Sequence, residues 1–504
     1  MGRISTKRFT FYLVIVMLVA STLFWFRCME LSYPSGIHDQ IRRFVNLEDT
    51  KSEVDLTVKF LGQSVVPAAA IERLENELTD QLTGNNIRAL KTMSSSELDP
   101  FIRQDVSDDA LDDYLDKEHC ASSGLSHYCL FVIHRNGTKK RGVIGRHRLA
   151  WIEVDNAEVS NSDTSTLLAH MLLYMTRCKL QYTDLGGKNE YKLLFNLINE
   201  DGTRAKSWDF EAIEKEFLDQ TTEALNSVLN LTIESQILYH HRLNLEPIYD
   251  QKKYYYFPFD MLKDSLNYDS IASRSGLDKS PFETILYFNL FIPSTDHSPL
   301  AVQVSPSQYT PAFVDLDFGG FVFHSCDPED ASSTLDLADL RLSFSLFRSQ
   351  LRQLLGFSEF EYVHVFQNIS FYHIPNKKVG FAQWELDCLA RHLISKNILE
   401  VKKILHAFSL ILDRKHVVLE DHIFRLVELS IQSGIASRLQ SEKALEHSSR
   451  SLWYAKQLES DPDMLPLYTF PTEKTYIVFL PLVMSLPFPA IKYVLEQRRR
   501  KNAK

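Results

Sequence analysis

Each end of the chain carries a hydrophobic segment long enough to enter a lipid bilayer, and the polar sequence lies between the two. Residues Phe9 to Phe26 contain no charged side chain, and Tyr476 to Leu495 contain a single one. A transmembrane α-helix needs ~20 mainly apolar residues. The sequence therefore predicts two transmembrane helices, with a large region between them on one side of the membrane.

Basic residues predict which side that region occupies, because Lys and Arg close to a transmembrane helix stay in the cytosol. Arg498, Arg499 and Arg500 follow the second segment closely, with Lys501 and Lys504 behind them. We therefore expect both termini in the cytosol and the intervening region in a lumen. The predicted organisation is a cytosolic tail (1–8), a transmembrane helix (9–26), a lumenal region (27–474), a second transmembrane helix (475–495) and a basic cytosolic tail (496–504).

A cleaved signal peptide is the alternative interpretation of the first segment. Its apolar run is longer than the usual core of a signal peptide, and Phe24-Trp25-Phe26 is a poor cleavage site, so we favour a retained helix. The last segment does not fit a removable lipid-anchor tail. Such tails end in apolar residues, whereas basic residues follow this segment.

Three sequons fall within the predicted lumenal region, at Asn136, Asn230 and Asn368. Because glycosylation acceptors are used in lumenal segments, all three are candidate N-glycosylation sites. Cys120 and Cys129 flank a Ser-Ser-Gly turn and could close a small disulfide loop in an oxidising lumen. Two buried thiols are the alternative for this pair.

The composition is that of a folded chain, because 44% of the residues are hydrophobic and 24% are charged. The net charge of −10 argues against nucleic-acid binding, which needs a basic surface. The length of the region between the hydrophobic ends predicts two or three compact units.

Strand-like and helix-like segments alternate from residue 54 to about residue 375, which predicts an α/β domain with a mixed sheet covered by helices. From about residue 380 to 460 the apolar spacing predicts long antiparallel helices. The predicted strands are Val54–Leu61, Tyr128–His134, Leu149–Val154, Tyr191–Ile198, Thr284–Ile292 and Gly320–His324, and the predicted helices of the α/β part are Thr164–Met175 and Asp209–Leu229.

A search for catalytic sequence motifs identifies no specific active site. No P-loop, GxSxG, HExxH or dinucleotide-binding motif occurs in a suitable sequence context. His324 and Cys326 could form a base–nucleophile pair, but a buried structural pair is the simpler interpretation because nothing in the sequence orients the histidine. Asp315 and Asp317 precede two glycines and are interpreted as a turn. We therefore expect no catalytic residue, no cofactor and no metal.

The stretch from Asp99 to Glu118 carries carboxylates three and four residues apart, which would crowd one face of a helix. It lacks the glycine and the terminal glutamate of a calcium-binding EF-hand loop. We interpret it as a solvated helix face, with contact to a basic partner as the second interpretation.

Six blocks in the second half of the chain occur in the order expected for one family. They are Asn230–Tyr239 (NLTIESQILY), Tyr287–Leu300 (YFNLFIPSTDHSPL), Phe318–Phe321 (FGGF), Gln350–Gly356 (QLRQLLG), Trp384–Asp387 (WELD) and Phe479–Pro489 (FLPLVMSLPFP). Together they resemble PIG-S, the family of a non-catalytic subunit of glycosylphosphatidylinositol (GPI) transamidase. The resemblance covers residues 230–504 and is poor over residues 30–190.

The resemblance implies a protein of the endoplasmic reticulum membrane with two transmembrane helices and a large lumenal domain. In that family the complex cleaves a C-terminal signal from a proprotein and joins the new end to GPI, and the cysteine-protease chemistry belongs to a separate caspase-like subunit. We therefore expect a structural subunit whose partners are the other transamidase subunits. Of the family's functional positions, only the sequon at Asn230 carries over to this sequence.

Two other functions remain open from the sequence. A membrane-tethered lumenal enzyme would use His324, Cys326 or the acidic stretch in its active site. A lumenal chaperone or cargo receptor would instead bind client proteins without a fixed stoichiometry.

Overall fold

The computed structural model describes most of the chain between residues 36 and 462. The described ranges are 36–47, 54–61, 87–95, 106–120, 127–134, 141–154, 162–176, 190–250, 254–265, 283–326, 332–357, 363–366, 369–412, 420–439 and 443–462, with a few isolated positions elsewhere. The chain divides into two compact units. The larger unit comprises residues 49–397 and 440–445, and the smaller comprises residues 1–48, 398–439 and 446–504.

Among the helices that the structure describes, none is both long and apolar enough to cross a bilayer. The predicted segment at Phe9–Phe26 lies outside the described residues, as does almost all of Tyr476–Leu495. Both transmembrane helices therefore stay predictions.

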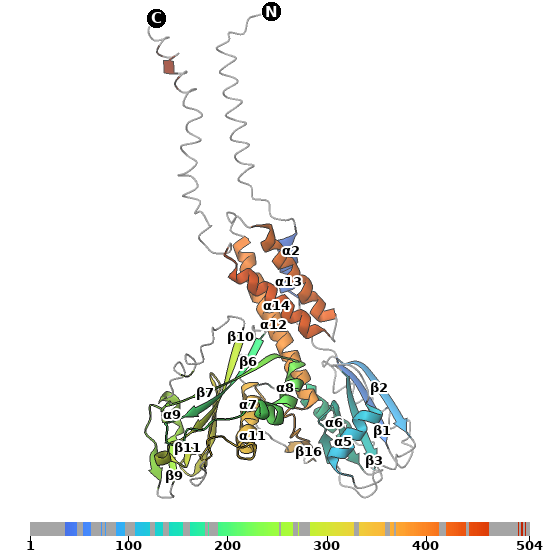
Figure 1. Cartoon of the computed structure of the whole chain (residues 1–504). Coiled ribbons are helices and arrows are strands. Elements are labelled where there is room, and N and C mark those ends of the chain that lie inside the picture. Colours follow the sequence, from blue (N-terminus) through green and yellow to red (C-terminus); the bar gives the residue numbers. More distant parts are fainter. Residues whose placement is uncertain are drawn as a thin grey trace, which may run out of the picture. The chain divides into compact units, whose positions relative to one another are not determined.

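The first sheet of the larger unit has seven strands in the order β15-β16-β4-β5-β3-β1-β2. Strands β1, β2, β3 and β16 of this sheet are labelled in Figure 1. The sheet is mixed, because β2, β1, β3 and β5 run parallel while β4 runs antiparallel to β5. Helices α5 and α6 contribute to separate apolar clusters that involve this sheet. The elements are β1 (Val54–Leu61), β2 (Ile87–Ser95), α5 (Asp108–His119), β3 (His127–His134), β4 (Arg141–Ile144), β5 (Leu149–Val154), α6 (Ser162–Thr176), β15 (Val363–Phe366) and β16 (Ile369–His373).

The second sheet has five strands in the order β13-β14-β10-β6-β7. Four of them are parallel, and their spatial order relative to the chain is that of a doubly wound sheet, with the switch point between β6 and β10. The elements are β6 (Glu190–Asn199), α7 (Phe210–Ile213), the π-helical turn Glu214–Leu218, α8 (Asp219–Asn226), β7 (Asn230–Leu238), β10 (Glu283–Ile292), β13 (Ala312–Asp315), β14 (Gly319–Phe323) and α11 (Leu337–Leu354).

The two faces of the five-stranded sheet are covered differently. Side chains of α7, α8 and α11 form the apolar core on one face, where the ring of Phe195 stacks on those of Phe288 and Phe344. A four-stranded sheet, ordered β12-β11-β9-β8, forms the core on the other face together with α9. These elements are β8 (Ile248–Asp250), β9 (Tyr254–Pro258), α9 (Phe259–Ser265), the 3-10 turn Thr295–His297, β11 (Leu300–Ser305) and β12 (Gln308–Thr310).

The prediction of a mixed α/β architecture is confirmed, although the strands form three sheets where the sequence predicted one. The turn interpretation of Asp315 and Asp317 is also confirmed. The Asp315 side chain accepts a hydrogen bond from the Asp317 backbone amide, and its carbonyl accepts one from Phe318.

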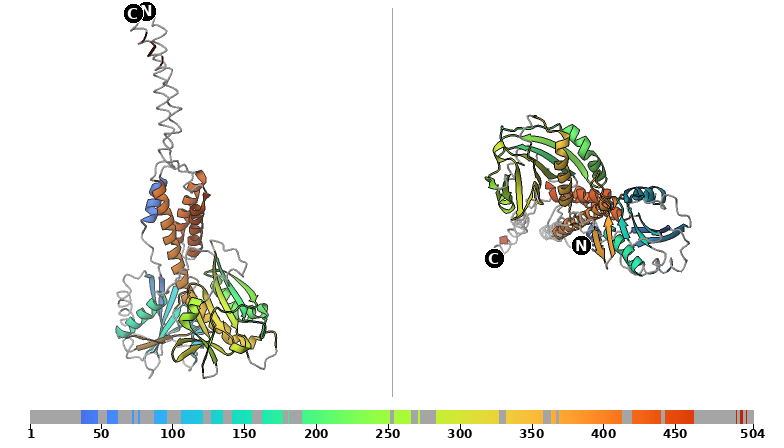
Figure 2. Two further views of the ribbon diagram at one scale, coloured as in Figure 1. Left: turned by 90° about the vertical axis from the view of Figure 1, so that its left-hand side faces the viewer. Right: turned by 90° about the horizontal axis from the view of Figure 1, so that it is seen from below.

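The smaller unit is a helical bundle. Helices α12, α13 and α14 run side by side in Figures 1 and 2, and the short helix α2 packs on α13. The ring of Phe44 on α2 lies where Gly434 leaves α13 without a side chain: a Cβ at Gly434 would be 2.6 Å from the ring. The elements are α2 (Ile37–Val45), α12 (Gln383–Leu412), α13 (Asp421–Leu439) and α14 (Ala444–Ser460). Helix α12 is continuous, and its residues up to Asn397 belong to the larger unit.

Candidate functional site

His324 and Cys326, the pair that an enzyme was expected to use, lie just beyond the end of β14. His324 Nδ1 lies 3.3 Å from the Ser343 hydroxyl on α11, and Cys326 carries a buried thiol that is not in a disulfide. Burial lowers the pKa of His324, and the nearby cation of Lys206 lowers it further while Asp339 opposes them. A neutral histidine held by a serine on the helix behind the sheet fits a structural role.

In an open α/β sheet, ligands bind outside the carboxyl ends of the parallel strands, at the switch point. Here that place lies between the ends of β6 and β10, and Glu200 spans it. Its carboxylate accepts a hydrogen bond from the Ser294 backbone amide at 2.7 Å, and its other oxygen lies 2.7 Å from His297 Nδ1. The Glu200 side chain is only 9% exposed.

Other residues at the end of β6 and after it bind segments that follow β7 and β14 or that precede α11. Arg204 donates to the carbonyl of Cys326 at 3.2 Å, and the backbone amide of His241 donates to the carbonyl of Asn199. Lys206 Nζ donates to the carbonyl of Ser332. The position where this fold usually holds a ligand is therefore bridged by the chain's own side chains, which stabilise the sheet.

The acidic stretch forms helix α5, and its interpretation as a solvated face is wrong at Asp112. This carboxylate is fully buried, and burial raises its pKa, although nearby His147 and Arg146 oppose the shift. Gly145 makes the burial possible, because a Cβ there would lie 1.9 Å from Asp112 Oδ1. The basic neighbours of this helix are Arg146 and His147, in the chain's own turn between β4 and β5, and contact with a basic partner stays a prediction.

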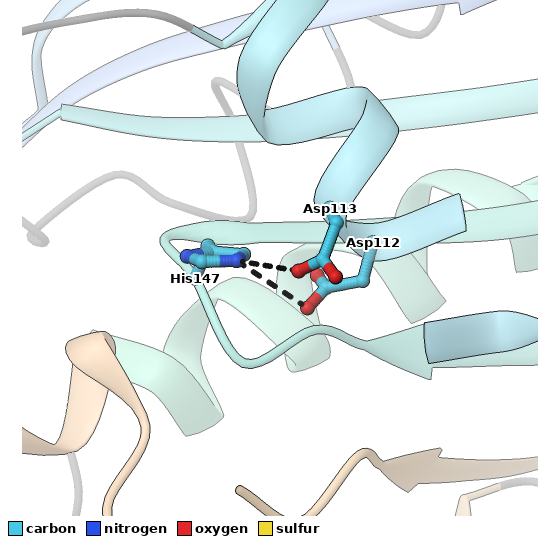
Figure 3. Close-up of side chains that lie close together, drawn as sticks. All are labelled: Asp112, Asp113 and His147. Atoms are coloured by element: carbon cyan, nitrogen blue, oxygen red, sulfur yellow. Dashed lines mark hydrogen bonds and ion pairs between the residues drawn. The ribbon is translucent and has the colours of Figure 1, made fainter. Parts of the chain in front are cut away.

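Figure 3 shows Asp112, Asp113 and His147 facing one another. Their possible ligand atoms lie within 4.8 Å of one another, close enough to share one metal ion. The guanidinium of Arg146 already neutralises these carboxylates. It lies 3.2 Å from Asp112 and 2.8 Å from Asp113, while His147 lies 3.2 Å from Asp113. Because a bound cation would have to displace this arginine, the residues present do not fit a metal site.

A junction of buried charges lies at the start of α12, in the block Trp384–Asp387. Glu385 forms a two-pronged ion pair with Arg352 of α11, at 2.7 and 2.9 Å, and both side chains are 7% exposed or less. The Arg352 guanidinium also lies over the rings of Phe357 and Phe381. This ion pair therefore fixes the start of α12 to α11, the helix that packs on the five-stranded sheet.

Asp387 and Trp384 fix the start of α12 to the seven-stranded sheet. Asp387 accepts two hydrogen bonds from Arg148, which raise the pKa of that arginine, and a third from Tyr128 at 3.3 Å. Trp384 donates from its indole to the carbonyl of Gly145 at 3.0 Å. Burial raises the pKa of Tyr128 to about 12, so this hydroxyl stays protonated. Trp384, Glu385 and Asp387 thus fix the start of α12 to the seven-stranded sheet and to the helix that packs on the five-stranded sheet.

Of the predicted modification sites, the structure describes Asn230, which is exposed at the first position of β7. Asn136 and Asn368 lie outside the described residues. Cys120, at the end of α5, is joined in the structure by a disulfide to Cys129 of β3, with Cα atoms 6.1 Å apart.

The chain matches the family model for Phosphatidylinositol-glycan biosynthesis class S protein (PIG-S) over residues 38–504. It is 26% identical over 334 residues to the GPI-anchor transamidase component PIGS of Bos taurus, and 25% identical over 341 residues to that of Mus musculus. These matches cover 61% and 62% of this chain and 58% of each relative. Because the family model spans most of the chain, this protein belongs to the PIG-S family.

Proposed function

We propose that this protein is a non-catalytic subunit of GPI transamidase that supports attachment of GPI anchors to the C-terminus of proproteins. The observation that carries the proposal is the family match over residues 38–504, together with relatives named as components of that transamidase. The catalytic cysteine would lie on a separate caspase-like chain.

Two structural features support a scaffold over an enzyme. The carboxyl ends of the parallel strands in the five-stranded sheet, where chemistry would be expected, are bridged by Glu200 and Arg204. The buried ion pairs of Glu385 and Asp387 instead join elements of the larger unit, because they fix the start of α12 to α11 and to the seven-stranded sheet. Such ion pairs hold elements within the larger unit in a fixed relation, which suits a subunit that presents a surface to partners.

The proposal places the protein in the endoplasmic reticulum membrane, spanning it twice at residues 9–26 and 475–495, with both termini cytosolic. The basic residues after the second segment support this orientation. The exposure of Asn230 supports it as well, because a lumenal glycosyltransferase could reach that side chain.

Depletion of the protein tests the proposal. We expect proproteins to accumulate with their hydrophobic C-terminal tails attached, while complete GPI lipid also accumulates because it is no longer consumed. Loss of GPI lipid itself would place the protein in lipid synthesis and would refute the assignment.

A further inference from the structure

Strand β7 leaves one edge of the five-stranded sheet without a neighbouring strand among the described residues. It has nine residues, whereas the other edge strands of this sheet and of the four-stranded sheet, β13, β12 and β8, have three or four. Proteins usually protect edge strands with short length, lysine, proline or bulges, because unpaired backbone groups attract other strands. The sequence of β7, Asn230–Leu238, contains no lysine, proline or glycine.

A row of side-chain amides crosses the sheet and ends at this edge. Gln236 of β7 donates to Asn196 of β6 at 2.7 Å, and Asn196 donates to Asn289 of β10 at 2.7 Å. Asn289 donates to the backbone carbonyl of Gly320 on β14 at 3.2 Å. Both asparagines are fully buried and face each other in register across the parallel strands.

The direction of this amide row is fixed by its inner end. The Gly320 carbonyl can only accept, so Asn289 must present its NH2 group to it and its oxygen to Asn196. The same reasoning turns the oxygen of Asn196 towards Gln236. At the β7 edge, therefore, the row ends in the Gln236 carbonyl oxygen, an acceptor that Gln236's donation to Asn196 leaves available.

The backbone of β7 also offers hydrogen-bonding groups on the outer edge. The amide of Leu231 donates to the Asn226 side chain at 3.1 Å, which marks it as directed away from β6. Alternate residues of a strand direct their backbone groups to the same edge. Ile233, Ser235 and Ile237 therefore direct theirs outward, while Thr232 and Glu234 pair with β6.

We propose that the outer edge of β7 binds an extended segment of a partner protein, which adds a strand to the sheet and places an Asn or Gln side chain opposite Gln236. The outward backbone groups, which have no partner strand among the described residues, favour an extended peptide as the occupant. The acceptor at the end of the amide row favours a donor side chain opposite Gln236. This inference rests on the proposed function, which supplies lumenal segments of other transamidase subunits as candidates.

Amide hydrogen exchange on the full chain, purified alone and in its native complex, tests the proposal residue by residue. We expect the amides of Ile233, Ser235 and Ile237 to exchange at least tenfold more slowly in the complex. The amides of Thr232 and Glu234 serve as internal controls, because their bonds to β6 protect them in both samples. Equal exchange of the outward amides in both samples would overturn the proposal.

A matched pair of variants tests the role of the amide row. Gln236→Met removes its acceptor, and we expect the outward amides in the complex to exchange ~5-fold faster than in the wild type, the effect of about one hydrogen bond. Gln308→Met changes an exposed amide on edge strand β12 and should leave them unchanged. Equal protection of the outward amides in both variants would show that the amide row does not contribute to binding of the partner strand.

Two further results would also be decisive. Protection of the outward amides in the isolated chain, with cross-links between two copies of it, would make a second copy the occupant and would refute a partner strand. Absence of transamidase subunits from the native complex would refute the proposed function. Their presence with unchanged exchange at β7 would refute this inference alone.

Discussion

At the scale of single residues, the ion pair between Arg352 and Glu385 is the strongest test of the junction on α12. Removing one member of a buried pair leaves an unpaired charge and typically costs about 3–5 kcal/mol. We expect Glu385→Gln to lower the free energy of unfolding by that amount in denaturant titrations. Glu446→Gln breaks an exposed pair with Arg450 on α14 and should cost about 0.5 kcal/mol or less. Similar losses in both variants would show that the junction carries no special stability.

His324 should make folding stability depend on pH. Burial holds the pKa of His324 below the ordinary value for histidine, so the unfolded chain binds the proton more readily than the folded chain does. Its contribution to stability is therefore present above about pH 6.5 and is lost as the pH falls. We expect His324→Asn, which cannot titrate, to lose less stability than the wild type between pH 7 and pH 5. Parallel pH profiles would contradict this.

Several of these residue-level contacts were beyond prediction from the sequence. Asp112 belongs to a solvated pattern of carboxylates, yet it is buried because Gly145, far away in the sequence, leaves room for it beside Arg146. The Trp384–Asp387 block was found by resemblance alone, since its partners Arg148 and Arg352 follow from tertiary packing. The local sequence gives only one indication of these buried ion pairs, which is that Glu385 and Asp387 lie among apolar residues at the start of a helix.

At the scale of secondary-structure elements, the docking of α2 on α13 is tested by whether Gly434→Ala raises or lowers the stability of the protein. Replacing glycine by alanine inside a helix usually stabilises it by about 1 kcal/mol. At Gly434 the added methyl group would lie 2.6 Å from the ring of Phe44, so we expect Gly434→Ala to be destabilising in thermal unfolding. Combining it with Phe44→Leu should restore part of the loss, because the clash is shared. A stabilising Gly434→Ala would show that α2 does not dock there.

Elements with strong local patterns were predicted well. The strands predicted at Val54–Leu61 and Leu149–Val154 have those bounds in the structure, and Tyr191–Ile198 is extended by one residue at each end. The helix predicted at Asp209–Leu229 contains a π-helical turn at Glu214–Leu218. Within that turn, the carbonyl of Phe217 accepts a hydrogen bond from Arg348 of α11. This contact comes from another helix, so the periodicity of the sequence does not reveal it.

At the scale of the whole molecule, the two predicted transmembrane helices give a test of topology. Glycosidase treatment should increase the electrophoretic mobility of the protein, and Asn230→Gln should reduce that shift by one glycan, because Asn230 is exposed. In sealed microsomes, protease added outside should remove a tag placed after Lys504. A protected tag would reverse the orientation, and an unchanged shift in the variant would show that Asn230 is unmodified.

The central claim, a structural subunit of a transamidase, is tested most directly by isolating the tagged full chain in mild detergent and measuring the intact mass of the assembly. We predict a complex of fixed stoichiometry that contains a caspase-like chain, and the same complex with undiminished GPI attachment when His324 and Cys326 are replaced by alanine. Isolation of the chain alone, or with client proteins in variable amounts, would contradict the account. Loss of GPI attachment from an intact alanine variant would identify an enzyme instead.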